Sequence, residues 1–524
     1  MNIISQITRF SGINKMIMGL AQRRARSFYN QDPLAVQRKL FQDLLLQGAS
    51  TSFGRDYNLA CIANCPFEAA YQYYRTHIPI RTYQQYWTDY FCTQSNGKVI
   101  NLRDVTWPGQ IKLFCETSGT TAPTKYIPFS DQMFLENRRA GLDLISCYID
   151  AHPESNILNG KILYMSGSTD LTKMEYGIFS GDMSAITLRF RPWYLRAFVE
   201  PSSNISSLPW EDKLQAMAEL LIHDKYIYAI SGVPPWILLL LKRCLEISGC
   251  DVLQDVLPNL ECIIHGGTSI KPYQAEFEKM FGISQPNYLE VLPSSEAFMG
   301  FQCAGDLSMR LTPYYGVFYE FVRFEDLDES GVPEPFASCV PLEQVEIGQR
   351  YAIILNTCSG LWRYHIGDTI RFTSLSPHFI EFTGRDRFLD KLEEKVTQSE
   401  VEQAVCVLNT SGNYDLGEFM VGTDVMARRH VWVLDVRTFR SDAEEAATIL
   451  DKTLERLNAD YATFRGQGRI NFPKVILVPE GTIYGWSSSI RGKLGGQSKI
   501  PHIDPTIDSS MISSLLEYAR KFAP

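Results

Sequence analysis

The sequence lacks the features of exported, membrane-spanning and nucleic-acid-binding proteins. Its longest apolar run, around Trp236 to Leu241, is far shorter than the roughly 20 residues that cross a bilayer. Arg9 and Lys15 interrupt the apolar residues at the start of the chain, and no positive charge precedes them, so we expect no export signal. The net charge of -9 argues against a general affinity for nucleic acid. We therefore expect a cytoplasmic protein without a membrane span.

Several motifs that would assign a common enzyme class are also missing. The twelve cysteines are scattered, and the closest pair, Cys61 and Cys65, has no matching Cys or His pair of a zinc site nearby. We expect reduced, mostly buried thiols. The chain has no G-x-x-x-x-G-K-[ST] phosphate loop, no G-x-S-x-G nucleophile elbow and no dinucleotide fingerprint, which disfavours P-loop nucleotidases, hydrolases and dehydrogenases.

The pattern of apolar residues predicts an α/β fold. At 524 residues the chain exceeds the roughly 250 to 300 residues at which one core stops growing, so we expect more than one domain. Segments typical of helices alternate with short apolar runs typical of buried strands. Residues 260–264 and 351–357 are predicted strands, and residues 271–281 are a predicted helix.

We predict a large domain over residues 1–383 and a smaller α+β domain over residues 384–524. A strand over 379–382 is expected to end in a charged turn, Thr383–Arg387, with the hinge near 384–388. In the second domain the predicted elements are strands over 418–422 and 430–435 and a helix that Ser441 and Glu444 open as a capping box.

The sharpest local motif is Thr117-Ser-Gly-Thr-Thr-Ala-Pro-Thr-Lys125, which follows a predicted strand over residues 111–114. Small hydroxyl residues around a glycine let the backbone approach a polyphosphate, while hydroxyl and N–H groups donate to its oxygens. Lys125 adds a positive charge. On this segment alone, a surface turn rich in Ser and Thr is an equal alternative.

Four further segments contain glycine, acidic or lysine residues that follow apolar runs or lie in loops. A predicted strand ends at Ile264-His-Gly266-Gly267, and Ser295-Glu296 follows another apolar run. Gly360-Leu-Trp-Arg-Tyr364-His-Ile-Gly-Asp368 supplies a carboxylate whose two oxygens suit a cis-diol, although a Gly-Asp pair alone is typical of an ordinary turn. The glycine-rich tail, residues 492–501, contains Lys499.

In this order the segments resemble the blocks of the adenylate-forming enzymes, with Ala122 where those enzymes often carry glycine. More narrowly, the chain is similar to bacterial members of the Gretchen Hagen auxin-responsive family of acyl-acid amido synthetases. The similarity extends through nearly the whole chain, from residues 51–55 to residues 497–501. It implies a large adenylate-forming domain of β-sheets flanked by helices, and a small domain that rotates between adenylation and acyl transfer.

The resemblance also implies roles for individual residues. Glu296 would bind Mg²⁺ and act in catalysis, Ser295 would lie at the α-phosphate, and Lys499 would bridge the substrate carboxylate and the α-phosphate, with Lys493 as its rival. The other implied contacts to ATP come from the phosphate loop, the glycine turn, the Gly-Asp block and the hinge: Thr117, Ser118, Gly119, Thr120, Thr121, Lys125, Gly266, Gly267, Tyr364, Asp368 and Arg385. The expected partners are ATP, Mg²⁺, a carboxylic acid and an amine or amino acid.

The sequence departs from the family pattern beside the glutamate. Leu292 stands where the family usually has an aromatic residue, Pro293 follows it, and Ala297 replaces a glycine. The loss of a stacking face would cost on the order of 1 kcal/mol of ATP binding. An adenylating ligase that uses coenzyme A or another thiol, and a nucleotide-binding protein without catalysis, stay as alternatives. The sequence leaves open the acid, the amine and the oligomeric state.

Overall fold

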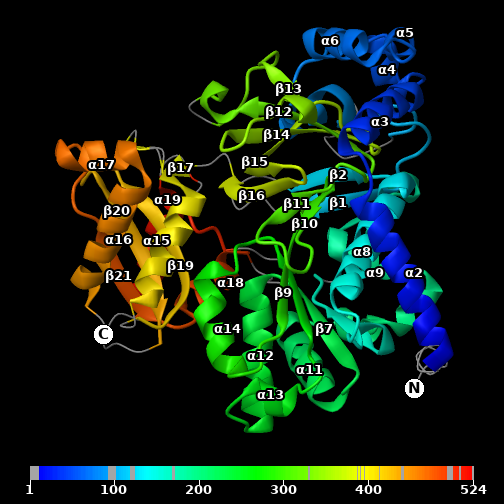
Figure 1. Cartoon of the computed structure of the whole chain (residues 1–524). Helices are drawn as coiled ribbons and strands as arrows, with labels where there is room; N and C mark the ends of the chain where they lie inside the picture. The colour runs from blue at the N-terminus through cyan, green and yellow to red at the C-terminus, as the bar shows by residue number, and fades with distance from the viewer. Residues whose placement is uncertain are drawn as a thin grey trace.

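The computed structural model describes residues 11–92, 102–117, 124–167, 171–328, 331–385, 388–389, 391–392, 394, 396–411, 414–437, 442–491, 500–504, 506 and 509–521. These residues form sheets flanked by helices, with the C-terminal elements gathered to one side (Figure 1). The predicted α/β fold class is therefore confirmed. No helix in this described part of the chain is long and apolar enough to cross a bilayer. The thiols of all twelve cysteines are free, and most of them are buried, as predicted.

The largest sheet has twelve strands among the described residues, and five neighbouring strands at one end of it are parallel. In sheet order these are β6 (Val199–Glu200), β3 (Lys161–Tyr164), β7 (Ile227–Gly232), β8 (Cys262–Gly266) and β9 (Asn287–Pro293).

Apolar side chains cover both faces of this parallel region, because successive residues of a strand point to opposite faces. In β8, Ile263 packs with helices α11 (Trp210–His223), α12 (Pro234–Ser248) and α14 (Gln274–Phe281). Its neighbours Cys262 and Ile264 belong to the core on the other face, which α8 (Asp131–Ala151) and α2 (Ser11–Tyr29) cover. The apolar run that predicted this strand is therefore a strand buried on both faces.

The other strands of the large sheet are antiparallel to their neighbours. In sheet order they are β10 (Phe298–Phe301), β11 (Met309–Leu311), β16 (His378–Arg385), β15 (Tyr364–Leu375), β14 (Arg350–Thr357), β12 (Val317–Arg323) and β13 (Cys339–Pro341).

A group of N-terminal helices packs on this antiparallel region. Asp32 opens α3 by accepting hydrogen bonds from the backbone N–H groups of Leu34 and Ala35. Phe41 of α3 then packs on Phe318 of β12, with ring centroids 4.6 Å apart. The helices of this group are α3 (Pro33–Gly48), α4 (Ser52–Asp56), α5 (Leu59–Ile62), α6 (Phe67–His77), α7 (Tyr83–Tyr86) and η1 (Trp87–Phe91).

A smaller sheet lies beside the large one. Its strands are β2 (Lys125–Phe129), β1 (Leu113–Thr117), β5 (Phe179–Gly181) and β4 (Thr172–Lys173), and β1 and β5 run parallel. The remaining short elements of this part of the chain lie between these strands and helices: η2 (Ile157–Asn159), η3 (Glu175–Gly177), α9 (Met183–Arg189), η4 (Trp193–Ala197), α10 (Ser203–Ser206), α13 (Leu253–Val256), η5 (Lys271–Tyr273), η6 (Phe324–Asp326) and η7 (Leu342–Gln344).

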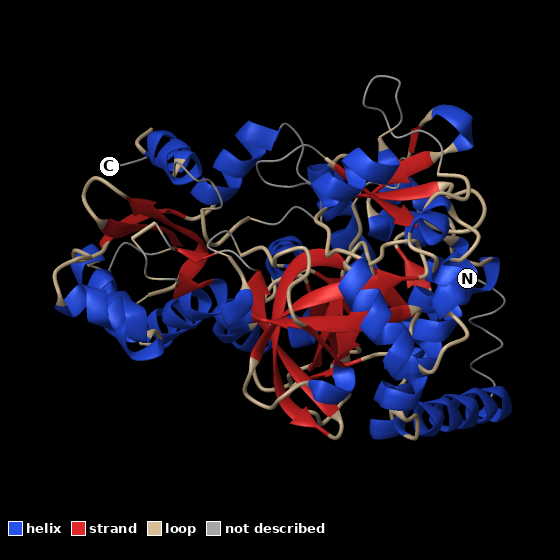
Figure 2. Ribbon diagram, turned by 90° about the horizontal axis from the view of Figure 1, so that it is seen from above, coloured by secondary structure: helices blue, strands red, loops and turns tan. Residues whose placement is uncertain are grey.

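The C-terminal elements have core clusters of their own. Trp432 and Leu434 of the three-stranded sheet face one cluster, whereas Val433 faces another on the opposite side. Figure 2 shows this sheet and its helices beside the large sheet. The elements are β17 (Phe388–Leu389), β18 (Val396–Thr397), α15 (Gln398–Thr410), β19 (Leu416–Asp424), β20 (Arg429–Val436), α16 (Ala443–Leu457), α17 (Ala459–Gly466), β21 (Lys474–Pro479), α18 (Thr482–Arg491) and α19 (Ser510–Ala519).

Ion pairs join the C-terminal elements to helices α12 and α14. Lys242 of α12 lies 3.0 Å from Glu276 of α14 and 2.7 Å from Glu480 of the C-terminal part. Arg437, which follows β20, pairs with both glutamates. These contacts fix how the two parts face one another in this structure. Nothing in them tests the division at residue 383, which stays a prediction.

Three local predictions need correction. The strand expected over 111–114 is β1, which begins at Leu113. The turn expected at Thr383–Arg387 is wrong for its first three residues, because β16 pairs with β15 as far as Arg385. Helix α16 is capped by Asp442, whose carboxylate accepts from the backbone N–H of Glu444. The residue predicted to cap it, Ser441, lies outside the described residues.

Candidate functional site

Two of the predicted blocks meet at one edge of the large sheet, because β8 and β9 are parallel and end side by side. Gly266 ends β8, and Gly267 follows it with a φ of +86° that favours glycine. A Cβ on Gly266 would lie 2.3 Å from the carbonyl oxygen of Val291 in β9, so this close approach also requires glycine. Crevices beyond the carboxyl ends of parallel strands are the usual binding places in open α/β sheets.

Glu296 lies at the same edge, in the short connection between β9 and β10. The connection is closed by Ser294, whose backbone N–H donates to the carbonyl of Ala297 at 2.8 Å. The Ser294 hydroxyl in turn accepts from the backbone N–H groups of Glu296 and Ala297. This tight turn holds Glu296 nearly buried, with 8% of its surface exposed. The predicted site residue Ser295 is half-buried in the same turn.

Tyr364 connects the Gly-Asp block to this glutamate. It is the first residue of β15, and its hydroxyl donates to Oε1 of Glu296 at 3.2 Å. The two residues are 68 positions apart in the chain. The structure therefore brings together two blocks that the sequence only places in order.

Two further predicted residues act on the charge of Glu296. Burial raises the pKa of the Glu296 carboxyl, the carboxylate of Asp368 raises it further, and the ammonium group of Lys125 lowers it to a smaller extent. Asp368 is itself buried, with 8% of its surface exposed. We call Lys125, Glu296, Tyr364 and Asp368 the Glu296 cluster. It contains two carboxylates close to each other and one ammonium group.

A bulge in β15 sets the position of Asp368. Ala352 of β14 pairs with Thr369, and Ile354 pairs with His365, so three residues of β15 lie opposite the single residue Ile353. Asp368 is one of the three, and its neighbour Gly367 has a φ of +85°. Bulges of this kind re-aim side chains and are common beside active sites.

The flanks of the predicted phosphate loop lie opposite one another. Thr117 ends β1 and pairs with Lys125 at the start of β2, so the loop is a connection between two antiparallel strands. The Lys125 ammonium group lies 5.6 Å from the ring centre of Tyr83, which fits a cation–π contact. The loop residues Ser118, Gly119, Thr120 and Thr121 lie outside the described residues.

The structure places the last predicted residues only in part. Arg385 is the final residue of β16 and pairs through its backbone with Asp368. Lys499 and its rival Lys493 lie outside the described residues, so the roles implied for them stay predictions. Leu292 and Ala297, where the chain departs from the family pattern, are both buried in the main core.

A buried ion pair beside Tyr364 is not among the features predicted from the sequence. Arg363 directly precedes this tyrosine, and its guanidinium Nε lies 3.2 Å from Oε2 of Glu320 in β12, with both side chains fully buried. A signal was present, because Glu320 is a charged residue inside the apolar run Val317–Val322. An ionised residue in such a run needs a buried partner.

Three consecutive segments of the chain match the domains of one family. Residues 27–231 match the GH3 family N-terminal domain, residues 311–385 its central domain and residues 379–505 its C-terminal domain. The chain belongs to the GH3 family. The family predicted from the motifs is confirmed, whereas the bacterial origin stays a prediction.

The curated relatives of this GH3 chain have the names of indole-3-acetic acid-amido synthetases and of a jasmonoyl–L-amino acid synthetase. It is 27% identical over 227 residues to the indole-3-acetic acid-amido synthetase GH3.10 of Arabidopsis thaliana, covering 40% of this chain and 38% of that protein. It is 25% identical over 261 residues to the jasmonoyl–L-amino acid synthetase JAR4 of Nicotiana attenuata, covering 46% of this chain and 44% of that protein. The chain thus spans less than half the length of these curated relatives.

Solved structures share the fold over nearly the whole of this GH3 chain. The acyl acid amido synthetase AtGH3.15, in complex with 2,4-DB, superposes with a TM-score of 0.74 at 17% identity, covering 96% of each chain. A 2-hydroxyisobutyryl-CoA ligase in the postadenylation state superposes with a TM-score of 0.51 at 13% identity, covering 97% of this chain and 93% of that one. At these identities the similarity establishes the fold alone.

The raised pKa of Glu296 predicts how its ionisation affects stability. Folding disfavours the ionised form of this carboxyl. The contribution of Glu296 to the stability of the wild-type chain therefore falls as the pH rises from the ordinary carboxyl pKa of about 4.5 through the raised value. The Glu296→Gln variant has no such ionisation. Without nucleotide and Mg²⁺, we expect it to melt at a higher temperature than the wild type at pH 8, with a gap that closes toward pH 4.5. Circular dichroism melts across this range measure the gap, and a gap independent of pH would contradict the assignment.

Proposed function

We propose that this chain is an ATP-dependent acyl-acid amido synthetase, which adenylates a carboxylic acid and transfers the acyl group to an amine or amino acid. The observation that carries the proposal is the Glu296 cluster, in which Lys125 of β2 and Tyr364 and Asp368 of β15 meet Glu296. Membership in the GH3 family supports it, as do the names of the relatives, an indole-3-acetic acid-amido synthetase and a jasmonoyl–L-amino acid synthetase.

In the first half-reaction, a carboxylate oxygen of the acid attacks the α-phosphorus of ATP, and pyrophosphate leaves with the electron pair of the broken bond. Lys125 and the residues after Thr117 are suited to hold the phosphates, because the loop joins two strands beside the cluster. Asp368 is suited to accept hydrogen bonds from the two ribose hydroxyls. Ser295, in the turn beside Glu296, is assigned to the α-phosphate.

In the second half-reaction, the nitrogen of a neutral amine attacks the acyl carbon, the bond from this carbon to the phosphate oxygen breaks, AMP leaves with the electron pair of that bond, and the nitrogen releases a proton. A water-poor site favours this step over hydrolysis. We assign Lys499 to the charge that accumulates on the α-phosphate. The predicted hinge near residues 384–388, which include Arg385, would let the C-terminal part turn between the two half-reactions.

Mg²⁺ fits the residues of the cluster. Magnesium commonly takes one or two carboxylates together with substrate phosphates, and Glu296 supplies a buried carboxylate whose pKa is raised by burial and by the nearby Asp368. Substrate phosphates and water molecules would complete the coordination. We assign Glu296 to the ion, which supplies charge stabilisation at the phosphates when it is bound.

The test is acid-dependent exchange of pyrophosphate into ATP. We expect exchange with at least one member of a panel of carboxylic acids that includes indole-3-acetic, jasmonic and 2,4-dichlorophenoxybutyric acids. Hydroxylamine should trap the activated acyl group, and an amino acid should then give an amide. Thioester formation with coenzyme A and no amide would instead establish a thiol ligase. No exchange with any acid of a broad panel would establish a nucleotide-binding protein without this chemistry.

A further inference from the structure

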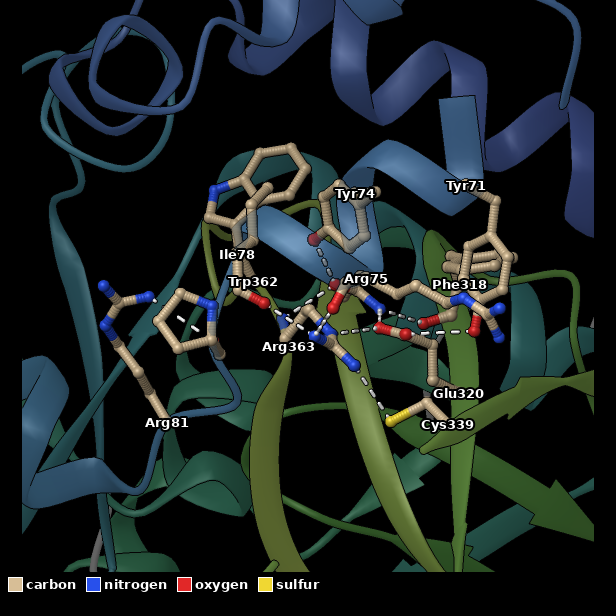
Figure 3. Close-up of polar contacts among 12 residues, drawn as sticks. Tyr71, Tyr74, Arg75, Ile78, Arg81, Phe318, Glu320, Cys339, Trp362 and Arg363 are labelled. Atoms are coloured by element: carbon tan, nitrogen blue, oxygen red, sulfur yellow. Dashed lines mark hydrogen bonds and ion pairs between the residues drawn. The ribbon is translucent and has the colours of Figure 1, made fainter. Parts of the chain in front are cut away.

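Arg363 is a fully buried arginine whose side chain is bound on every side. Besides Nε on Glu320, its Nη1 donates to the carbonyl oxygens of Arg75 at 2.9 Å and Ile78 at 2.6 Å. Its Nη2 donates to Sγ of Cys339 at 3.0 Å. Figure 3 shows these contacts converging on one guanidinium from α6, β12 and β13. A planar fork of this kind fixes orientation as well as charge, which a lysine would not do.

Glu320 is held as firmly as the arginine. Its Oε1 accepts from the hydroxyl of Tyr71 at 3.1 Å, and its Oε2 accepts from the amide of Asn356 at 3.1 Å as well as from Arg363. Burial alone would lower the pKa of Arg363, but the Glu320 carboxylate raises it above its usual range. The Arg363 guanidinium therefore keeps its positive charge at every physiological pH. Because buried ion pairs are weak sources of stability, their value often lies in fixing a position.

The backbone of Arg363 is bound as tightly as its side chain. Its N–H donates to Oδ1 of Asn356 at 2.7 Å, and its carbonyl accepts from the N–H of Arg81 at 3.0 Å. The residue has a φ of +49°, a left-handed conformation that a non-glycine residue keeps only when its surroundings impose it. On the far side of Tyr364, the N–H of His365 donates to the carbonyl of Arg81 at 2.9 Å. Tyr364 is thus clamped on both sides.

We propose that Arg363 and Glu320 are positioning residues that hold the hydroxyl of Tyr364 on the carboxylate of Glu296. The ion pair fixes the position of the first residues of β15. The hydroxyl of Tyr364 then holds the carboxylate of Glu296, which is assigned to Mg²⁺. The connection to catalysis rests on the proposed function. The positioning of Tyr364 itself does not, and it can be measured in the protein without substrates.

The experiment uses 3-fluorotyrosine at position 364 in the whole chain, free of nucleotide and Mg²⁺. At one fixed pH, we expect its ¹⁹F resonance to differ between the wild type and Glu296→Gln, because the hydroxyl of this ring donates to the Glu296 carboxyl. Replacing the ion pair with Arg363→Met and Glu320→Gln together should reduce this difference to less than half and broaden the line. An unchanged difference and line width in the double variant would overturn the proposal.

A second measurement separates positioning from general damage to the fold. In pyrophosphate exchange, the double variant should need about tenfold more Mg²⁺ for half-maximal rate, as is typical when a supporting residue of a metal ligand is lost. The double variant should cause no such increase when it is combined with Tyr364→Phe. Its fall in melting temperature should be the same with and without Tyr364→Phe. An equal increase in both backgrounds would show that the pair does not act through Tyr364.

Two further variants provide an alternative to the double variant and a control. Arg363→Lys keeps a cation beside Glu320 but loses the fork, so it tests the same two readouts should the double variant not fold. The matched control is Arg310→Lys, since Arg310 pairs with Asp306 at 2.6 Å and lies on β11 of the same sheet. It should change neither the ¹⁹F resonance nor the Mg²⁺ requirement. A wild type without exchange would refute the proposed function, whereas the ¹⁹F result alone decides the role of the ion pair.

Discussion

Replacing Glu296 with alanine is expected to lower acid-dependent pyrophosphate exchange by about 100-fold or more, because a metal ion at the phosphates contributes several kcal/mol of charge stabilisation. The loss should fall mainly on the rate at saturating ATP, and additional Mg²⁺ should recover only part of it. Steady-state exchange at several Mg²⁺ concentrations measures both effects.

The matched control is Glu261→Gln. Glu261 immediately precedes β8, at the opposite edge of the sheet, where its carboxylate accepts hydrogen bonds from Ser155 and Asn156. We expect its exchange rate to stay within about twofold of the wild type, as is usual for a change outside the reacting centre. If Glu296→Ala keeps the wild-type rate and Mg²⁺ requirement, Glu296 does not hold the metal.

The sequence predicted the elements that local pattern controls. The apolar runs at 260–264 and 351–357 became β8 and β14, and residues 271–281 became η5 followed by α14. These segments are buried, so their periodicity and composition report directly on their surroundings. The adjacent polar residues Ser441 and Asp442 show the limit of such reasoning. Either one suits a helix cap, and only the backbone decides that Asp442 accepts from Glu444.

The geometry of the site depends on contacts between distant segments, which no local pattern encodes. The bulge that places Asp368 arises from the pairing of β15 with β14, so the motif around Gly367 does not reveal it. The expected turn at Thr383 failed for the same reason, since pairing with β15 extends β16 to Arg385. Glycine at 384, with a φ of +101°, lets the strand continue through an irregular pair.

The ion pair behind the site shows a third limit. Arg363 was visible as part of a motif and Glu320 as a charge in an apolar strand, but their sequence separation of 43 residues concealed that they pair. A buried charge is costly, so the presence of one predicts a partner without identifying it. The structure identifies the partner and thereby links the antiparallel half of the sheet to Tyr364.

Removing the carboxylate of Asp368 is the second change with a large expected effect. A hydrogen bond to a charged group contributes about 1.5 to 3 kcal/mol, so losing two of them in Asp368→Ala should lower kcat/KM for ATP by about 100-fold or more. The KM for ATP should rise, while the dependence on the carboxylic acid stays as in the wild type. Initial rates of pyrophosphate exchange at varied ATP measure the change.

Substrate analogues make this prediction specific to the ribose. With 2′-deoxy-ATP one of the two hydrogen bonds is already absent, so the loss in Asp368→Ala should be about tenfold smaller than with ATP. The matched control is Asp224→Asn, because Asp224 binds Lys161 at 2.8 Å just before β7, at the opposite edge of the sheet. The ratio of kcat/KM for ATP to kcat/KM for 2′-deoxy-ATP should be the same in Asp224→Asn as in the wild type. An equal loss with both nucleotides would mean that Asp368 acts on Glu296 and its metal rather than on the ribose, since the Asp368 carboxylate raises the pKa of Glu296.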